Sequence, residues 1–288
     1  MIQRNALRSW KELGADVDVL LMGAEEGAAE AAAELGLRFV PRIPRNPQGT
    51  PLLSAMFELA REHSDSPLLA YANADILLLP DFLETARSTA GQLERFLLVS
   101  QRWDLDVTAP LDFSTGWQER LRADIRQRGR LHPRGGSDIF IYPRECFTQL
   151  PDFAIGRSGW DNWMFYEARR RGWSLVDATG EITLVHQDHD YSHLPGGRPH
   201  YRQPESAENV HLAGGNRRIF TLADIDRRLV DGQVRRVPLS WKKFWREVEI
   251  FPLVRLHSSL LADLFFAVFH PYRAYGEFRA WLASRQAG

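Results

Sequence analysis

The sequence predicts an α/β protein with a mostly parallel sheet flanked by helices, followed by a helical C-terminal extension. Short apolar runs alternate with helical patterns over the first hundred residues, as is typical of βαβ units. The 288 residues are 44% hydrophobic and 25% charged, which allows a sizeable core. Beyond residue 216 the pattern changes to basic and aromatic-rich helical segments.

The first half of the chain holds four predicted helices and four predicted strands. Apolar residues at helical spacing predict helices over residues 5–13, 25–35, 52–63 and 81–96. Short apolar runs predict strands over residues 17–22, 37–40, 68–72 and 97–101. The second helix is rich in alanine and ends at Gly36, and four prolines between residues 41 and 51 predict a loop.

The second half is less regular. We expect helices over residues 118–128 and 160–171, and strands over residues 138–142, 174–177 and 182–186. Residues 186–215 are polar, with histidine, proline and glycine throughout, which predicts an active-site loop or lid. The extension, residues 216–288, either packs as helices on the main domain or lies on a membrane surface through residues 216–281.

Composition excludes several classes of protein. A net charge of -1 argues against a nucleic-acid binder. The single cysteine, Cys146, excludes an internal disulfide framework and cysteine-rich zinc modules. No signal peptide is visible, and no apolar stretch approaches the roughly 20 residues of a spanning helix. We therefore expect a protein that is cytoplasmic or peripheral to a membrane.

A carboxylate directly follows the third predicted strand, in the segment Asn73-Ala74-Asp75. Ligands of α/β proteins bind at the carboxyl edge of the sheet. A carboxylate there can hold a divalent ion that bridges two phosphates. The alternative is a turn, which Asn and Asp also favour.

A second candidate lies in the segment Gly156-Arg-Ser-Gly-Trp-Asp-Asn-Trp163. Asp161 falls in the first turn of a predicted helix, where the helix dipole favours a charged carboxylate. Between Trp160 and Trp163 it could act as a general base beside a sugar-stacking platform. The alternative is a helix-capping aspartate with two core tryptophans.

Three histidines and two aspartates follow the last predicted strand within eight residues. They are His186, Asp188, His189, Asp190 and His193. Histidine and aspartate are metal ligands and proton carriers. The spacing lacks the HExxH pattern of zinc proteases, and hydrogen-bonded histidines in a polar loop are the alternative.

In their order along the chain, these segments resemble those of glycosyltransferases with the GT-A fold, of the family-2-like group. LLAYANADILLL is similar to the strand that carries the DXD motif, with Asn73 at the first Asp and Asp75 at the second. GRSGWDNW resembles the later acidic motif that supplies the base of inverting enzymes, at Asp161. His186 matches in order the histidine that often completes the metal site. The resemblance covers residues 1–215.

The resemblance implies a glycosyltransferase that moves a sugar from a nucleotide-diphosphate sugar to an acceptor hydroxyl with inversion. Asp75 and His186 would hold Mn²⁺ or Mg²⁺, and Asp161 would be the catalytic base. The resemblance also implies further contacts. The donor would be bound by Arg4, Asn73, Asp75 and Asp138, and the acceptor or sugar by Trp160, Asn162 and Trp163. A lid would include His189, Asp190 and His193.

The resemblance also implies a GT-A-like catalytic domain at residues 1–215 and an extension at residues 216–288. The family opens with a strand ahead of the first helix, whereas this chain begins within that helix. We therefore expect either a start further upstream or an incomplete nucleotide wall.

Two other functions remain open at this stage. A metal-dependent hydrolase would use His186, His189 and His193 as its ligands. A non-catalytic carbohydrate-binding or scaffold protein would keep the fold without turnover. For the transferase, a saccharide and a lipid-linked acceptor are equally compatible with the sequence, and no motif identifies the nucleotide or the sugar.

Overall fold

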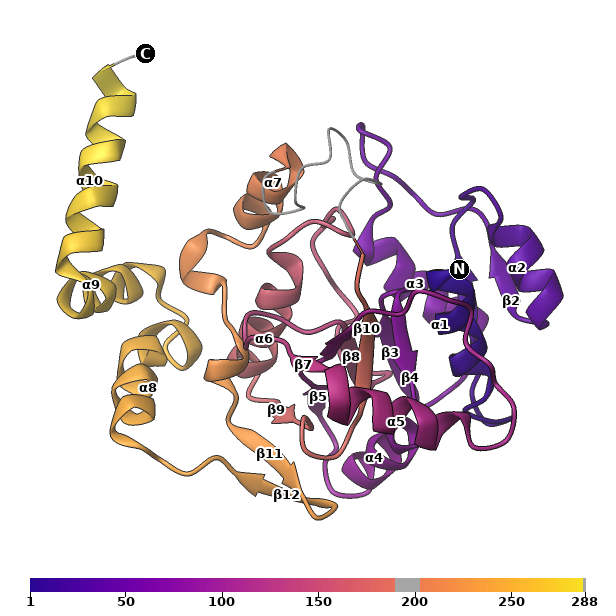
Figure 1. The fold of residues 1–288 in the computed structure, drawn as a ribbon. Coiled ribbons are helices and arrows are strands. Elements are labelled where there is room, and N and C mark those ends of the chain that lie inside the picture. The colour runs from indigo at the N-terminus through magenta and orange to yellow at the C-terminus, as the bar shows by residue number, and fades with distance from the viewer. Residues whose placement is uncertain (190–202, 287–288) are drawn as a thin grey trace.

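The structure is a computed structural model that describes residues 1–189 and 203–286 of the chain (Figure 1). A six-stranded sheet forms its centre, in the order β12-β11-β9-β5-β8-β3. These strands are β3 (Leu68–Ala72), β5 (Phe96–Val99), β8 (Ile139–Pro143), β9 (Ser174–Asp177), β11 (Arg227–Val230) and β12 (Gln233–Arg236). The α/β class expected from the sequence is confirmed.

The sheet is mixed rather than mostly parallel. β9 pairs in parallel with β5 and β11, but β8 is antiparallel to both β3 and β5, and β12 is antiparallel to β11. The alternation of helices and strands predicts βαβ units, yet 39 residues of mostly irregular chain separate β5 and β8 and allow the reversed direction.

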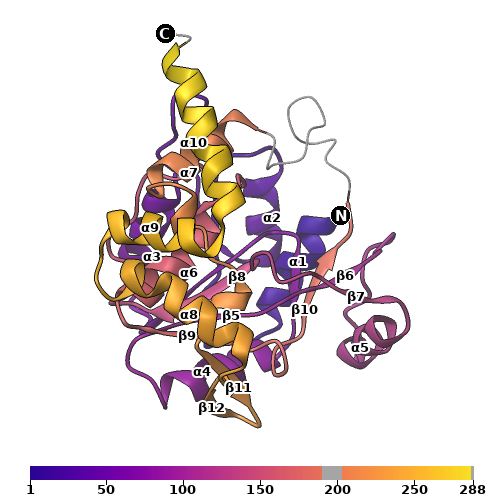
Figure 2. The same ribbon diagram turned by 90° about the vertical axis from the view of Figure 1, so that its left-hand side faces the viewer.

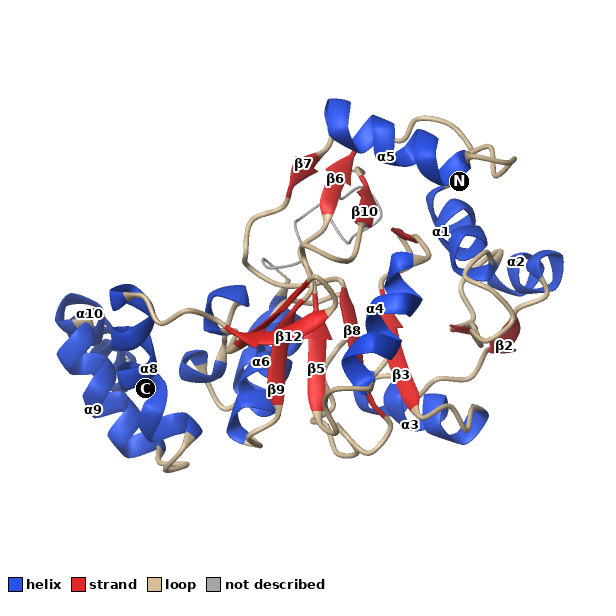
Figure 3. Ribbon diagram, turned by 90° about the horizontal axis from the view of Figure 1, so that it is seen from below, coloured by secondary structure: helices blue, strands red, loops and turns tan. Residues whose placement is uncertain are grey.

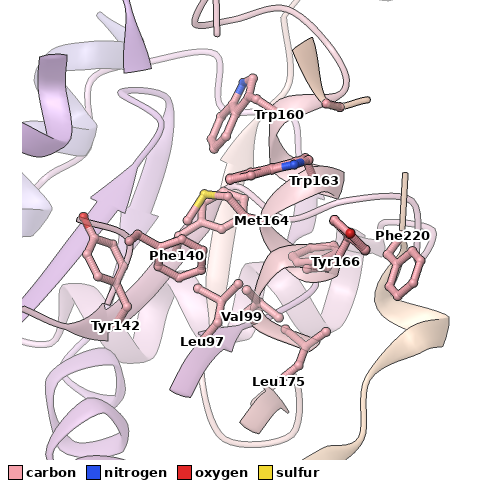
Figure 4. Packing of buried hydrophobic residues seen from close by; sticks show 14 of the residues in the cluster. Leu97, Val99, Phe140, Tyr142, Trp160, Trp163, Met164, Tyr166, Leu175 and Phe220 are labelled. Atoms are coloured by element: carbon pink, nitrogen blue, oxygen red, sulfur yellow. The ribbon is translucent and has the colours of Figure 1, made fainter. Parts of the chain in front are cut away.

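Helices cover both faces of this sheet because alternate strand residues point to opposite sides. On one face Leu97 and Val99 pack with residues of α3 (Leu53–His63), α6 (Trp160–Arg170) and α8 (Trp241–Val254). Figure 4 shows part of this cluster, with Met164 above Phe140. On the other face Phe96 and Leu98 pack with α4 (Asp81–Ala90), and α1 (Ile2–Lys11) covers the same cluster.

A second sheet of four short strands stands beside the first, in the order β4-β10-β6-β7. Its strands are β4 (Ile76–Leu78), β6 (Trp103–Leu105), β7 (Arg130–Leu131) and β10 (Leu184–Gln187). Leu77, Leu105 and Val185 form its core with α5 (Trp117–Arg128). Figure 3 shows this sheet and α5 above the end of the larger sheet.

A third, two-stranded parallel sheet pairs β1 (Leu20–Met22) with β2 (Arg38–Val40), connected by α2 (Ala28–Leu35). Gly36, with φ 63°, ends α2 in a left-handed conformation that favours glycine. Between this sheet and β3 lies an apolar cavity of about 370 Å³, lined by residues that include Leu20, Met22, Leu68 and Ala70.

The C-terminal part differs from the expected purely helical extension. The segment after α7 (Pro204–Leu212) forms two 3₁₀ turns and the β11–β12 hairpin, which extends the main sheet. The helices α8, α9 (Ser259–Phe269) and α10 (Pro271–Gln286) then follow along one side of the molecule (Figure 2). In the described parts of the chain, no helix is long and apolar enough to cross a membrane.

Candidate functional site

Polar side chains gather where three strands of the main sheet reach the same edge. β3, β5 and β9 run in one direction, so their carboxyl ends share this edge, and the antiparallel β8 begins there. Asn73 and Asp75 therefore follow β3 at the point where Asp138 leads into β8. The Asn73 amide N–H donates to the Asp138 carbonyl at 3.1 Å.

Asp75 meets two histidines at this edge. Its Oδ2 lies 3.5 Å from His186 Nε2 and 3.2 Å from His189 Nε2. Burial would raise the pKa of Asp75, but hydrogen bonds and charge from the two histidines lower it well below its usual range. The other oxygen, Oδ1, is buried without a hydrogen-bond partner in the described structure.

These three residues fit a divalent cation. Their ligand atoms lie within 4.8 Å of one another, and the Oδ1 atom of Asp75 needs an electropositive partner. Carboxylate and imidazole together suit Mn²⁺ and related ions, whereas an all-oxygen set would favour Mg²⁺. The structure thus brings the two predicted metal ligands, Asp75 and His186, together and adds His189.

Two further carboxylates face the other nitrogen of His186. Its Nδ1 lies 3.4 Å from Asp104 and 3.5 Å from Asp188, longer than a good hydrogen bond. β10 carries His186 and pairs it with Asp104 of β6. Asp104 also lies 2.8 Å from His132 Nδ1. The Nδ1 atom of His186 is buried without a hydrogen-bond partner in the described structure. A carboxylate behind a ligand histidine favours one ring orientation and tautomer, so Asp104 is placed to orient His186.

A chain of hydrogen bonds connects the sheet edge to Arg102. The Tyr71 hydroxyl donates to Asn73 Oδ1 at 2.7 Å, and the Asn73 amide donates to Asp138 at 2.7 Å. Arg102 donates to Asp138 at 2.8 Å and to Asp104 at 2.9 Å. Asn73 and Asp138, both predicted to contact the donor, are therefore fixed in place by their neighbours.

Asp161 lies near the same edge, in the first turn of α6. Gly159 precedes the helix with φ 107°, and its N–H donates to Asp161 Oδ1 at 3.3 Å. Burial raises the pKa of Asp161 to about 6; backbone N–H groups, Asn162 first, oppose this rise and the charge of Asp138 adds to it. A carboxyl with this pKa exchanges protons near neutral pH, as a general base requires.

Gly136 leaves the space that Asp161 occupies. A Cβ at residue 136 would lie 2.4 Å from Asp161 Oδ2. Tyr71 connects this carboxylate to the others: burial first, and then the charges of Asp75, Asp138 and Asp161, raise the pKa of Tyr71 far above its usual value. The negative charge of the three aspartates therefore acts on this one phenol.

Four predicted ligand contacts are placed elsewhere. Trp160 and Trp163 are 5% and 6% exposed and pack in the core (Figure 4). Trp160 lies against Tyr71 and Phe140 of the sheet and Trp163 against Phe153, so neither offers a face to a sugar. Asn162 donates to the Gly135 and Phe220 carbonyls, which occupies its amide. Arg4 pairs with Glu34 of α2 instead of reaching the sheet edge.

The predicted lid is described only in part. His189 belongs to the candidate cation site. Asp190 and His193 lie outside the described residues.

Sequence reasoning missed three supporting residues of the site, which are Tyr71, Arg102 and Asp104. Asp104 sits in the segment Arg102-Trp-Asp-Leu-Asp106, directly after a predicted strand, in the same position relative to its strand as Asp75. This repeat of the pattern at Asp75 was the sequence signal that could have identified Asp104.

No known family model matches the chain, and no curated protein is similar to it. Among the solved structures that are similar to it are two with 15% sequence identity. One is GalNAc-T7 with UDP, GalNAc and Mn²⁺, with 15% identity and a TM-score of 0.43. The similarity covers 68% of this chain and 42% of that one, so the chain spans less than half of its length.

The other is glucosyl-3-phosphoglycerate synthase from Mycobacterium tuberculosis in complex with phosphoglyceric acid. It has 15% identity and a TM-score of 0.46, over 83% of this chain and 82% of that chain.

Proposed function

We propose that the chain transfers a sugar from a nucleotide-diphosphate sugar to an acceptor hydroxyl, with a divalent cation at Asp75, His186 and His189. The observation that carries this proposal is the buried, unpartnered Oδ1 of Asp75 at the carboxyl edge of the sheet, with two imidazoles on its other oxygen. A bound cation would neutralise charge on the departing nucleotide diphosphate.

Asp161 is the base in this proposal. With a pKa of about 6 it is mostly ionised at pH 7.5 and can take the proton of the attacking hydroxyl. Its backbone N–H partners keep the carboxylate in place while the proton moves. The acceptor hydroxyl would attack the anomeric carbon from the side on which Asp161 lies, opposite the leaving group. This attack would invert the anomeric centre.

The supporting residues position these groups. Arg102 holds Asp104 and Asp138, and Asp104 lies behind the ring of His186. The Nε2 lone pair of His186 is then directed to the Asp75 side, where the cation would be. Hydrogen bonds with Tyr71 and Asp138 hold Asn73 in place. Its side chain is therefore not free to bind the cation where a second carboxylate would.

The catalytic unit of this proposal is larger than residues 1–215, because the β11–β12 hairpin extends the main sheet. A further strand that precedes α1 also remains a proposal. The cavity between β1 and β3 supports it: in the described structure β1 pairs only with β2 and β3 only with β8, so two unpaired edges border an apolar space. Such a strand would join the two sheets.

Thermal unfolding tests the donor site. We would compare UDP, GDP, CDP and dTDP sugars, each with and without Mn²⁺, on the wild type, on Asp75→Ala and on Asp124→Ala, an exposed control on α5. A ligand at 100 times its Kd stabilises by about 2.7 kcal/mol, a shift of a few degrees at this size. We expect one nucleotide to give a Mn²⁺-dependent shift that Asp75→Ala loses and Asp124→Ala keeps.

Activity separates the transferase from its alternatives. With the donor so identified, Asp161→Asn should keep the shift and lose about 10² to 10⁴ of the rate. Full activity in Asp161→Asn would refute its role as base. A thermal shift with no turnover on any acceptor would instead favour the binding protein, and tightly bound zinc with no nucleotide effect would favour the hydrolase.

A further inference from the structure

An exposed apolar surface runs along α9 and the start of α10. Leu260, Leu264, Val268 and Tyr272 follow one another at intervals of four residues, with exposed fractions of 81%, 58%, 71% and 92%. At this spacing successive residues stack along one line of a helix. The first three form one line on α9, which ends at Phe269, and Tyr272 follows at the start of α10. A line of exposed large apolar side chains continued by an exposed tyrosine is unusual on a folded surface.

Aromatic residues extend this surface. Exposed aromatic side chains flank the line on both sides along the chain: Trp241, Trp245 and Phe251 on α8, and Tyr275, Phe278 and Trp281 on α10. The three helices lie on the same side of the molecule (Figure 2), and α9 contacts both α8 and α10. We call these side chains, together with the α9 line, the C-terminal face.

The charges around the C-terminal face are unbalanced. All four carboxylates between residues 241 and 286 are in ion pairs, namely Glu247, Glu249, Asp263 and Glu277. Five basic side chains of the same segment form no ion pair in the described structure, namely Lys242, Arg255, Arg273, Arg279 and Arg285. The face therefore presents positive charge next to apolar and aromatic groups.

We propose that the C-terminal face docks on the surface of an anionic lipid bilayer. Tryptophan and tyrosine prefer the headgroup level, aliphatic side chains enter the acyl boundary, and each basic residue is attracted to anionic headgroups. A second copy of the chain fits less well, because a two-fold contact would bring the same positive charges together. This inference does not depend on the proposed transferase activity.

Arg217 holds the face in position on the protein. It pairs with Asp263 of α9 and Glu277 of α10, and its guanidinium lies over the ring of Phe266. Its single positive charge is shared by the two exposed carboxylates, which weakens their repulsion of anionic lipid. The contacts of α9 with α8 and the burial of Ala262 in the main core complete the attachment.

Vesicle sedimentation of the full chain tests the proposal. We expect the protein to pellet with phosphatidylcholine vesicles that contain about one third phosphatidylglycerol, and to be released as salt rises from about 0.1 to about 0.5 M. Leu260→Glu with Leu264→Glu should abolish pelleting. Leu131→Glu, at an exposed apolar residue of β7, is the matched control and should pellet like the wild type.

A charge series sharpens the test. Lys242→Ala, Arg273→Ala and Arg279→Ala combined should weaken binding about 100-fold, from about a fivefold factor for each charge. Arg42→Ala with Arg126→Ala, two exposed residues elsewhere, should change it little.

The proposal is overturned if the wild type stays in the supernatant with anionic vesicles. It is equally overturned if pelleting is the same for neutral vesicles and for the charge variants. If light scattering then finds a dimer that Leu264→Glu dissociates, a second copy covers the face.

Discussion

Replacing Asp161 with asparagine should stabilise the protein at neutral pH. The pKa of Asp161 rises from 3.8 in the unfolded chain to about 6 in the folded protein. Between these values the folded state holds a proton that the unfolded state has lost, so the stability of the wild type falls as the pH rises through this window. Above pH 6 the full cost of the buried charge is present.

The shift of about 2 pH units corresponds to about 3 kcal/mol at 1.36 kcal/mol per unit. Because the side chain is only partly buried, solvent screening reduces this figure, and we expect a gain of about 1–3 kcal/mol for Asp161→Asn at pH 7.5. Below about pH 4 the Asp161 carboxyl is protonated in both the folded and the unfolded protein. The stability gain of Asp161→Asn should then vanish.

Urea unfolding from pH 4 to 8 measures this difference. The wild type, Asp161→Asn and the exposed control Asp124→Asn would be compared at each pH. The difference in unfolding free energy between the wild type and Asp161→Asn should grow between pH 4 and pH 6. The difference between the wild type and the control should stay near zero. A difference of constant size across the range would refute a charge effect and would indicate altered packing.

Three further predictions concern the site and the core. Gly136→Ala should displace the Asp161 carboxylate and lower turnover at least tenfold, whereas Gly135→Ala, with open space at its Cβ, should leave kinetic constants nearly unchanged; equal effects of both would argue against the close approach. Asp104→Asn should weaken Mn²⁺ binding about 10- to 100-fold by calorimetry, because the ring of His186 loses its oriented partner; unchanged affinity would exclude that role. Phe165→Ala should cost about 3–5 kcal/mol in urea unfolding, because this ring is fully buried in the main core, and a cost below about 1 kcal/mol would contradict such packing.

The strands and helices of the main sheet were largely predictable from the sequence. The apolar runs predicted β3, β5 and β9 to within one or two residues. The signal has its clearest cause in β5, which is buried on both faces and therefore apolar throughout. The direction of β8 was not predictable, since a residue pattern carries no information on strand direction. In the second sheet, β10 overlaps the strand predicted over residues 182–186, whereas β4, β6 and β7 are two or three residues long and too short for a periodic signal.

The candidate site was predictable in part, for the same kind of reason. Asp75 and Asp161 follow features that sequence encodes, a strand end and a helix start. The side chains of Trp160 and Trp163 fit either a core or a sugar platform by type alone, and only packing on the sheet assigns them to the core. Arg102 and Asp104 are joined to the site through partners more than thirty residues away, which no local pattern reveals.

Asp75 lies in the turn where the chain passes from β3 of the large sheet to β4 of the small one. His186 belongs to β10, the neighbour of β4 in the small sheet, and the next residue, Gln187, donates its N–H to the Asp75 carbonyl. An ion shared by Asp75 and His186 would therefore brace the point where the two sheets meet. The affinity for the ion would then depend on how the two sheets meet. Substitutions under α5, far from any ligand atom, should therefore alter this affinity by tilting one sheet against the other.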